Sequence, residues 1–197
     1  MYLCLLDRLL SLFKTNKLNM SEELKQHILK NGLTLGGILV AITTFTYIGG
    51  PELVTNYAVS IGSLVLMIAF PIYHTRRYRT TNDGFISFRE AFTSCTGILI
   101  AAGFINTFAS ILLYNIIDPG FGLEVVDAII NKTVAQLEGI GAEESLIEQT
   151  IKTLEEGSSF EAANMFKGYI FSIIFYTVFG LLVAAFTKNE KPEFSEE

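Results

Sequence analysis

The chain has 197 residues, of which 50% are hydrophobic and only 17% charged, and its mean hydropathy is +0.44. This composition is too apolar for an ordinary soluble domain. The net charge of −6 argues against nucleic acid as a partner, because a phosphate-binding protein needs a basic face. The two cysteines, Cys4 and Cys95, are far apart in sequence and imply no disulfide framework.

Four long windows contain no Asp, Glu, Lys or Arg: residues 31–51, 53–75, 91–117 and 168–187. Each is close to the roughly 20 residues that cross a hydrocarbon core of ~30 Å. Four such windows cannot all be buried in a soluble fold of this length, since too little polar sequence remains to cover them. The pattern predicts an all-α polytopic membrane protein. Its membrane domain, residues 31–187, has four transmembrane helices at about 31–48, 57–73, 91–117 and 168–186.

The segment before the first window, residues 1–30, is predicted to be cytoplasmic. Two interpretations stay open for residues 1–19, where Asp7 and Arg8 interrupt the leucines too early for a signal-peptide core. One helical face carries Leu3, Leu6, Leu10 and Phe13, which is typical of a segment lying in the membrane surface. Alternatively, Met20 is the true start and Ser21 caps the first helix.

The first two windows carry packing and exit signals. Gly32 and Gly36 form a GxxxG pair, which favours close packing within the chain over a dimer interface. Pro71 lies near the end of the second span and indicates an exit from the helix. His74 has no second ligand at suitable sequence spacing, so an interfacial role is favoured over a metal or proton role.

The stretch between the second and third windows, residues 71–92, predicts a turn and a helix start. Residues 82–84, Asn-Asp-Gly, are typical of a turn, and Ser87 with Glu90 forms a capping box that starts a helix at Phe88. The phenylalanine spacing predicts a ring cluster at headgroup level that fixes the depth of the helix. The residues proposed to contact anionic lipid or a protein partner are Arg76, Arg77, Arg79, Phe85, Phe88 and Arg89.

A polar stripe runs through the third window, where Gly103, Asn106, Ser110 and Tyr114 share one helical face. An amide in hydrocarbon needs a partner, so Asn106 is expected to face the bundle and meet the threonines of the first span. Asn106 and Ser110 are interpreted as a hydrogen-bonded packing seam or as the lining of a permeation path. The absence of intramembrane charges favours the seam.

Residues 118–167 form the one long hydrophilic segment. Its apolar spacing predicts two amphipathic helices packed as a hairpin, broken at Gly139 and Gly141. The segment is acidic but lacks the Asp-x-Asp-x-Asp-Gly pattern of a calcium loop, and Glu148 and Lys152 have the spacing of a helical ion pair, so a solvated acidic face is favoured over a cation site. Ser158 and Glu161 form a second capping box for the last helix, and the tail, residues 187–197, is expected to fray.

The orientation follows from the basic residues. Eleven lie on the side of the termini and the central arginines, against three, Lys132, Lys152 and Lys167, on the other side. The positive-inside rule therefore places both termini in the cytoplasm and the hairpin outside. Without residues 1–19 the count is eight against three, and the orientation holds.

The order of these elements resembles the bacterial four-helix membrane family catalogued as domain of unknown function 4199. The resemblance covers about residues 22–188. It includes the sequence GFISFREAF at residues 84–92, the Asp118-Pro119 pair that closes the third span, the helical insert, and the last span ending in Thr187-Lys188. Residues 1–19 have no counterpart in the family pattern, which favours Met20 as the start. The family has no established activity, so the resemblance implies fold and location only.

The spans contain no metal-ligand spacing, no Ser/His or Ser/Lys arrangement and no paired carboxylates, so we predict no enzyme, no catalytic or metal residue and no cofactor. The favoured function is a non-enzymatic structural, interaction or accessory role in the bacterial inner membrane. Its contacts would be lipid and an unidentified protein partner or second copy. The alternative is a small transporter or channel subunit, which would act as an oligomer because four spans are few for a pore.

Overall fold

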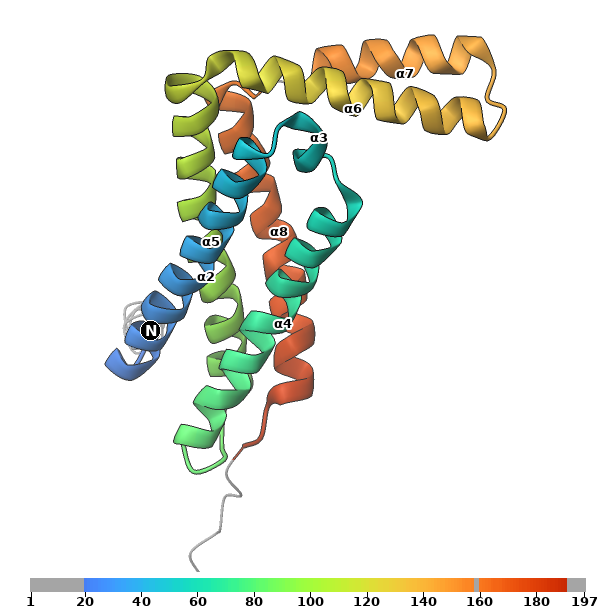
Figure 1. The fold of residues 1–197 in the computed structure, drawn as a ribbon. Helices are drawn as coiled ribbons and strands as arrows, with labels where there is room; N and C mark the ends of the chain where they lie inside the picture. Colours follow the sequence, from blue (N-terminus) through green and yellow to red (C-terminus); the bar gives the residue numbers. More distant parts are fainter. Residues whose placement is uncertain (1–19, 158–159, 191–197) are drawn as a thin grey trace, which may run out of the picture.

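Each uncharged window of the sequence forms one long helix, since the helix satisfies the backbone hydrogen bonds of an apolar segment internally. The structure is a computed structural model and describes residues 20–157 and 160–190. The four long helices are α2 (Glu22–Ile48), α4 (Tyr57–Thr81), α5 (Phe88–Leu112) and α8 (Ala162–Thr187). They form an elongated bundle, and the π-helix η1 (Leu113–Ile117) extends α5 (Figure 1).

Two of these helices extend well beyond their predicted spans. α2 begins at Glu22, where the Ser21 hydroxyl accepts a hydrogen bond from the Leu24 amide at 3.2 Å, as expected for an N-cap. α4 continues past Pro71 to Thr81, so the exit predicted at Pro71 was wrong. The uncharged windows behind the predicted spans are bounded by charged residues, which mark where the apolar surface of a helix ends. The backbone hydrogen bonds of the helix continue beyond those residues, so these two helices are longer than their predicted spans. The four long helices are long and apolar enough to cross a membrane.

The hydrophilic insert forms α6 (Pro119–Gly139) and α7 (Glu144–Gly157), which lie side by side across one end of the bundle (Figure 1). The break falls at the predicted glycines, and Gly141 has a φ of 73°. The one ion pair in the described part of the chain joins Lys25 to Glu22. The ion pair predicted between Glu148 and Lys152 does not form. Both side chains are exposed, and such pairs gain little in water.

The remaining connections are short. A single-turn helix, α3 (Pro51–Val54), fills the link between α2 and α4 and contacts α6. α8 begins after Glu161, whose side chain makes no cap hydrogen bond. The cap predicted at Ser158 lies outside the described residues.

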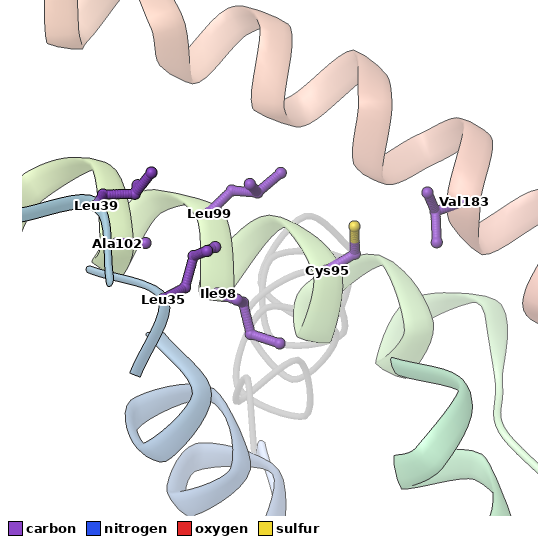
Figure 2. Packing of buried hydrophobic residues seen from close by; sticks show 7 residues of the cluster. All are labelled: Leu35, Leu39, Cys95, Ile98, Leu99, Ala102 and Val183. Carbon is purple, nitrogen blue, oxygen red and sulfur yellow. The ribbon is translucent and has the colours of Figure 1, made fainter. Parts of the chain in front are cut away.

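α5 is the central helix, and it contacts α2, α4 and α8. Figure 2 shows the core that results, in which side chains of α5 meet those of α2 and α8. This buried cluster consists of Leu35, Leu39, Cys95, Ile98, Leu99, Ala102 and Val183. Large apolar side chains elsewhere on α4 and α8, such as Leu64, Phe171 and Phe175, are exposed.

Glycines allow α5 to approach its two main neighbours closely. A Cβ atom added to Gly32 would lie 2.6 Å from the Cβ of Ala101, and one added to Gly36 would lie 2.9 Å from Cδ1 of Ile105. On the other side, a Cβ on Gly180 would lie 2.0 Å from Oγ1 of Thr96. The GxxxG pair of α2 therefore packs within the chain, as the sequence predicted.

Candidate functional site

The turn between α4 and α5 has the predicted local structure. Asp83 and Gly84 have φ angles of 52° and 82°, which an Asn-Asp-Gly sequence accommodates. The Ser87 hydroxyl accepts a hydrogen bond from the Glu90 amide at 3.2 Å, and the Ser87 amide donates to the Glu90 carboxylate at 2.9 Å. The capping box is therefore confirmed, and it fixes the direction in which α5 leaves the turn.

The same turn is fastened to the end of α8. The amide of Ile86 donates to the Asn189 carbonyl at 2.8 Å, and the Asn189 amide donates back at 2.9 Å. The Asn189 side chain also donates to the Gly84 carbonyl at 2.8 Å. Residues 188–190 are thus fixed, contrary to the expected fraying, because the turn offers them unpaired backbone groups. Residues 191–197 lie outside the described part.

The predicted contact residues divide into exposed and anchored groups. Arg76, Arg77, Phe88 and Arg89 are exposed. Arg79 is half-buried and donates to the Thr187 carbonyl at 3.2 Å, so its guanidinium holds the end of α8. Phe85 is half-buried and lines a cavity of about 390 Å³ beneath the turn.

The predicted phenylalanine cluster does not form between the two rings on α5. Phe92 packs against Ala184 and below Gly180 of α8, and no ring contact joins it to Phe88 within the described residues. The cause is the close approach of α8, whose glycine leaves room for the ring.

A cleft opens between the beginnings of α2 and α5, beside the exposed arginines. Its volume is about 570 Å³, and its lining includes the cations Lys25 and Arg89 together with the hydroxyls of Ser21 and Thr93. Glu90 also lines it, with its carboxylate hydrogen-bonded to Ser87. Two cations from different helices therefore border one opening at this end of the bundle.

Both histidines of the chain meet at this end. The ring centroids of His27 on α2 and His74 on α4 are 6.4 Å apart, and the ring of Tyr78 lies 4.8 Å from that of His27. The inference that His74 has no second histidine nearby was wrong, because sequence spacing does not reveal the pairing of α2 with α4. No cluster of three or more metal-ligating side chains occurs in the described residues.

The polar stripe of α5 faces the bundle as predicted. The Thr43 hydroxyl of α2 donates to the Asn106 side-chain oxygen at 3.0 Å, and Ser110 is buried. Gly103 lies against the ring of Tyr176 of α8. Asn106 therefore has the threonine partner on the first long helix that the sequence predicted.

The opposite end of the bundle has polar links that the sequence did not predict. The Tyr47 hydroxyl donates to Asp118 Oδ2 at 3.1 Å, while Asp118 Oδ1 accepts from the Phe121 amide at 3.2 Å and caps α6. Lys132 of α6 donates to the Thr55 carbonyl and lies 3.9 Å from the centroid of the Tyr57 ring. These links hold α6 against α2 and α3. Tyr47 and Asp118 are 71 residues apart in sequence, and Thr55 and Lys132 are 77 apart, so neither hydrogen bond could be predicted from neighbouring residues. Only the Asp118-Pro119 pair marked this end of the third span in the sequence.

The comparisons with known proteins identify one family. A family model described as "Protein of unknown function (DUF4199)" matches residues 30–189. No curated protein and no solved structure matches the chain.

Proposed function

The chain belongs to the DUF4199 family of proteins of unknown function, and from this premise and its fold we propose that it is a non-enzymatic accessory protein of the bacterial inner membrane. Its basic end would lie at the cytoplasmic face and contact anionic lipid. The hydrophilic insert formed by α6 and α7, here called the α6–α7 arm, would lie outside. The observation that carries this proposal is the charge difference between the ends of four apolar helices. Seven described cations lie near the end where α2 begins and α8 ends: Lys25, Lys30, Arg76, Arg77, Arg79, Arg89 and Lys188.

The orientation is tested by labelling single cysteines with an impermeant maleimide in intact cells, after Cys4 and Cys95 are replaced. Ile140, at the tip of the α6–α7 arm, is 81% exposed, and Arg76 is exposed at the other end. We expect Ile140→Cys to react in intact cells and Arg76→Cys to react only after lysis. The opposite pattern would refute the orientation.

The lipid contact follows from the exposed cations around the turn. Arg76 and Arg77 on α4, and Arg89 beside the cleft at the start of α5, have no ion-pair partner in the described structure. A basic residue near an anionic surface contributes about 1 kcal/mol of binding, and salt screens this attraction. The expected ligand is therefore the phosphate of a lipid headgroup.

The lipid contact is tested by thermal unfolding in nanodiscs of phosphatidylglycerol and of phosphatidylcholine. We expect phosphatidylglycerol to stabilise the native protein, and the triple variant Arg76→Gln/Arg77→Gln/Arg89→Gln to lose most of that difference. Lys152→Gln removes an exposed cation from α7 and is the matched control. If the triple variant keeps the full difference between the two lipids, these arginines are not the lipid contact.

The packing seam supports a structural role over transport. The Thr43 hydroxyl donates to the Asn106 side-chain oxygen between α2 and α5, so these two groups are paired with each other inside the chain. Reconstituted vesicles test the alternative of a transporter or channel subunit. Solute flux in such vesicles that is lost in Asn106→Leu would favour that alternative.

A further inference from the structure

α4 packs on the central core through Leu66, Met67, Phe70 and Ile72, and its fully buried residues lie in its second half. The buried residues of this helix are Pro71, Thr75 and Tyr78, while most of its earlier residues are exposed. Thr75 shares a hydrogen bond of 3.1 Å with Ser94 of α5, and the hydroxyl of Tyr78 lies 3.5 Å from that of Ser21 before α2. α4 is therefore attached at this end by contacts with both α5 and α2.

The ring of His27 lies between α2 and α4 at this end, and Asn31 fixes the tautomer of the neutral ring. The Asn31 side-chain amide donates to the His27 carbonyl at 2.7 Å, which orients its nitrogen toward the ring. The same nitrogen lies 3.2 Å from His27 Nδ1, so Nδ1 must accept and the neutral ring carries its proton on Nε2. This Nε2 is buried and has no hydrogen-bond partner within the described residues.

A second proton on His27 would be unfavourable in this arrangement for three reasons. The new N–H at Nδ1 would face the donor nitrogen of Asn31 and break their hydrogen bond. Nε2 would carry part of a positive charge without an acceptor. The charged groups that interact with the two rings are Lys30 on α2 and Arg77 on α4, both cations.

No carboxylate from the described part of α5 or α8 offsets these charges at the two rings. Glu23 lies one helical turn before His27 on α2, yet the two form no ion pair. On α4, the groups next to His27 are the imidazole of His74 and the phenol of Tyr78. A proton taken up here would therefore meet cations and aromatic rings, and separation of α2 from α4 would relieve the conflict.

We propose that His27 forms a proton-sensitive latch between α2 and α4, where it lies beside His74 and Tyr78, and that the latch is closed when His27 is neutral and opens when His27 takes up a second proton. Opening admits water to His27 Nε2 and frees the basic end of α4 to move away from α2. The latch depends on the geometry of these side chains and not on the lipid contact, so either proposal can fail alone.

The first test uses the fact that the chain has only two histidines. Nitrogen-15 NMR of the histidine-labelled protein in nanodiscs reports the tautomer and the protonation of each ring separately. We expect one histidine to be the Nε2–H tautomer at about pH 8, and its signal to vanish in His27→Phe. Observation of His27 as the Nδ1–H tautomer would overturn the proposal without any functional assay.

The second test measures the distance between the helices. Spin labels at Gln26→Cys on α2 and Thr80→Cys on α4 occupy exposed sites next to the latch, in a background with Cys4 and Cys95 replaced. Between about pH 8 and about pH 3.5, we expect the distance to increase as the NMR signal of His27 changes to the protonated form, because burial of the ring lowers the pKa of His27 to about 4.

His27→Phe keeps an aromatic ring against Tyr78 but cannot take up a proton, so the distance in this variant should stay constant across the same range. His74→Phe retains His27 and should still open. A distance that does not change in the native protein would overturn the latch, as would an opening that persists in His27→Phe.

Discussion

Replacement of Gly32 by alanine tests the close packing of α2 on α5. The new methyl group would lie 2.6 Å from the Cβ of Ala101, whereas carbon atoms in contact are usually about 3.5–4.0 Å apart. Ala101 has no side-chain torsion that could move this atom, so the two helices must separate by about 1 Å. Such overpacking costs about 1–3 kcal/mol of unfolding free energy.

Gly37 provides a matched control five residues further along the same helix. A Cβ atom at Gly37 would meet nothing within 4 Å. Both substitutions gain up to about 1 kcal/mol in helix propensity, so the difference between the two variants isolates the collision. Ala101→Gly removes the opposing methyl group and should restore the stability of Gly32→Ala.

The assay uses Cys95, which is 0% exposed in the core that joins α2 to α5. In a Cys4→Ser background, a dye that fluoresces on reaction with thiols reports the exposure of Cys95 during heating. We expect Gly32→Ala to unfold several degrees below Gly37→Ala, since 1 kcal/mol corresponds to about 2–4 °C at this size. Equal melting of the two variants, or no rescue by Ala101→Gly, would refute the packing argument.

Three further predictions concern the polar links. Thr43→Val and Asn106→Leu should show a coupling energy of about 0.6–1.7 kcal/mol in a double-mutant cycle of unfolding, and additive effects would contradict their hydrogen bond. Tyr47→Phe should lose about 1 kcal/mol of stability because Asp118 loses a donor, while Tyr73→Phe at an exposed site should change little. Asn189→Ala should speed amide hydrogen exchange at Ile86, because the turn loses the side-chain hydrogen bond to Gly84. Asn164→Ala, at an exposed site, is the control. Unchanged exchange in Asn189→Ala would show that this hydrogen bond does not hold the turn.

The features predicted correctly from the sequence are set by neighbouring residues. The Ser87–Glu90 capping box, the turn at Gly84 and the break at Gly141 all depend on groups within a few positions. Helical periodicity also placed Gly32 and Asn106 toward the bundle, because every inward face of a helix in this fold meets another helix. The positions where helices end were less accurate, since α4 continues through polar sequence beyond Pro71.

The features that were missed depend on which helices are neighbours. His27 meets His74 because α2 packs against α4, and Ile86 pairs with Asn189 because α8 ends beside the turn. Apolar helices of similar composition can be arranged in several orders, and their hydropathy does not distinguish these orders. For the same reason, the hydrogen bond from Arg79 to the Thr187 carbonyl was not predicted.

The central place of α5 has a consequence for biogenesis. α5 is the third of the four long helices to leave the ribosome, and α2 and α4 share fewer contacts with each other than either gains from it. The first two helices therefore lack most of their packing contacts until α5 has been made. A nascent chain that stops before α5 would lack a core, and such a fragment should be an early substrate for proteases.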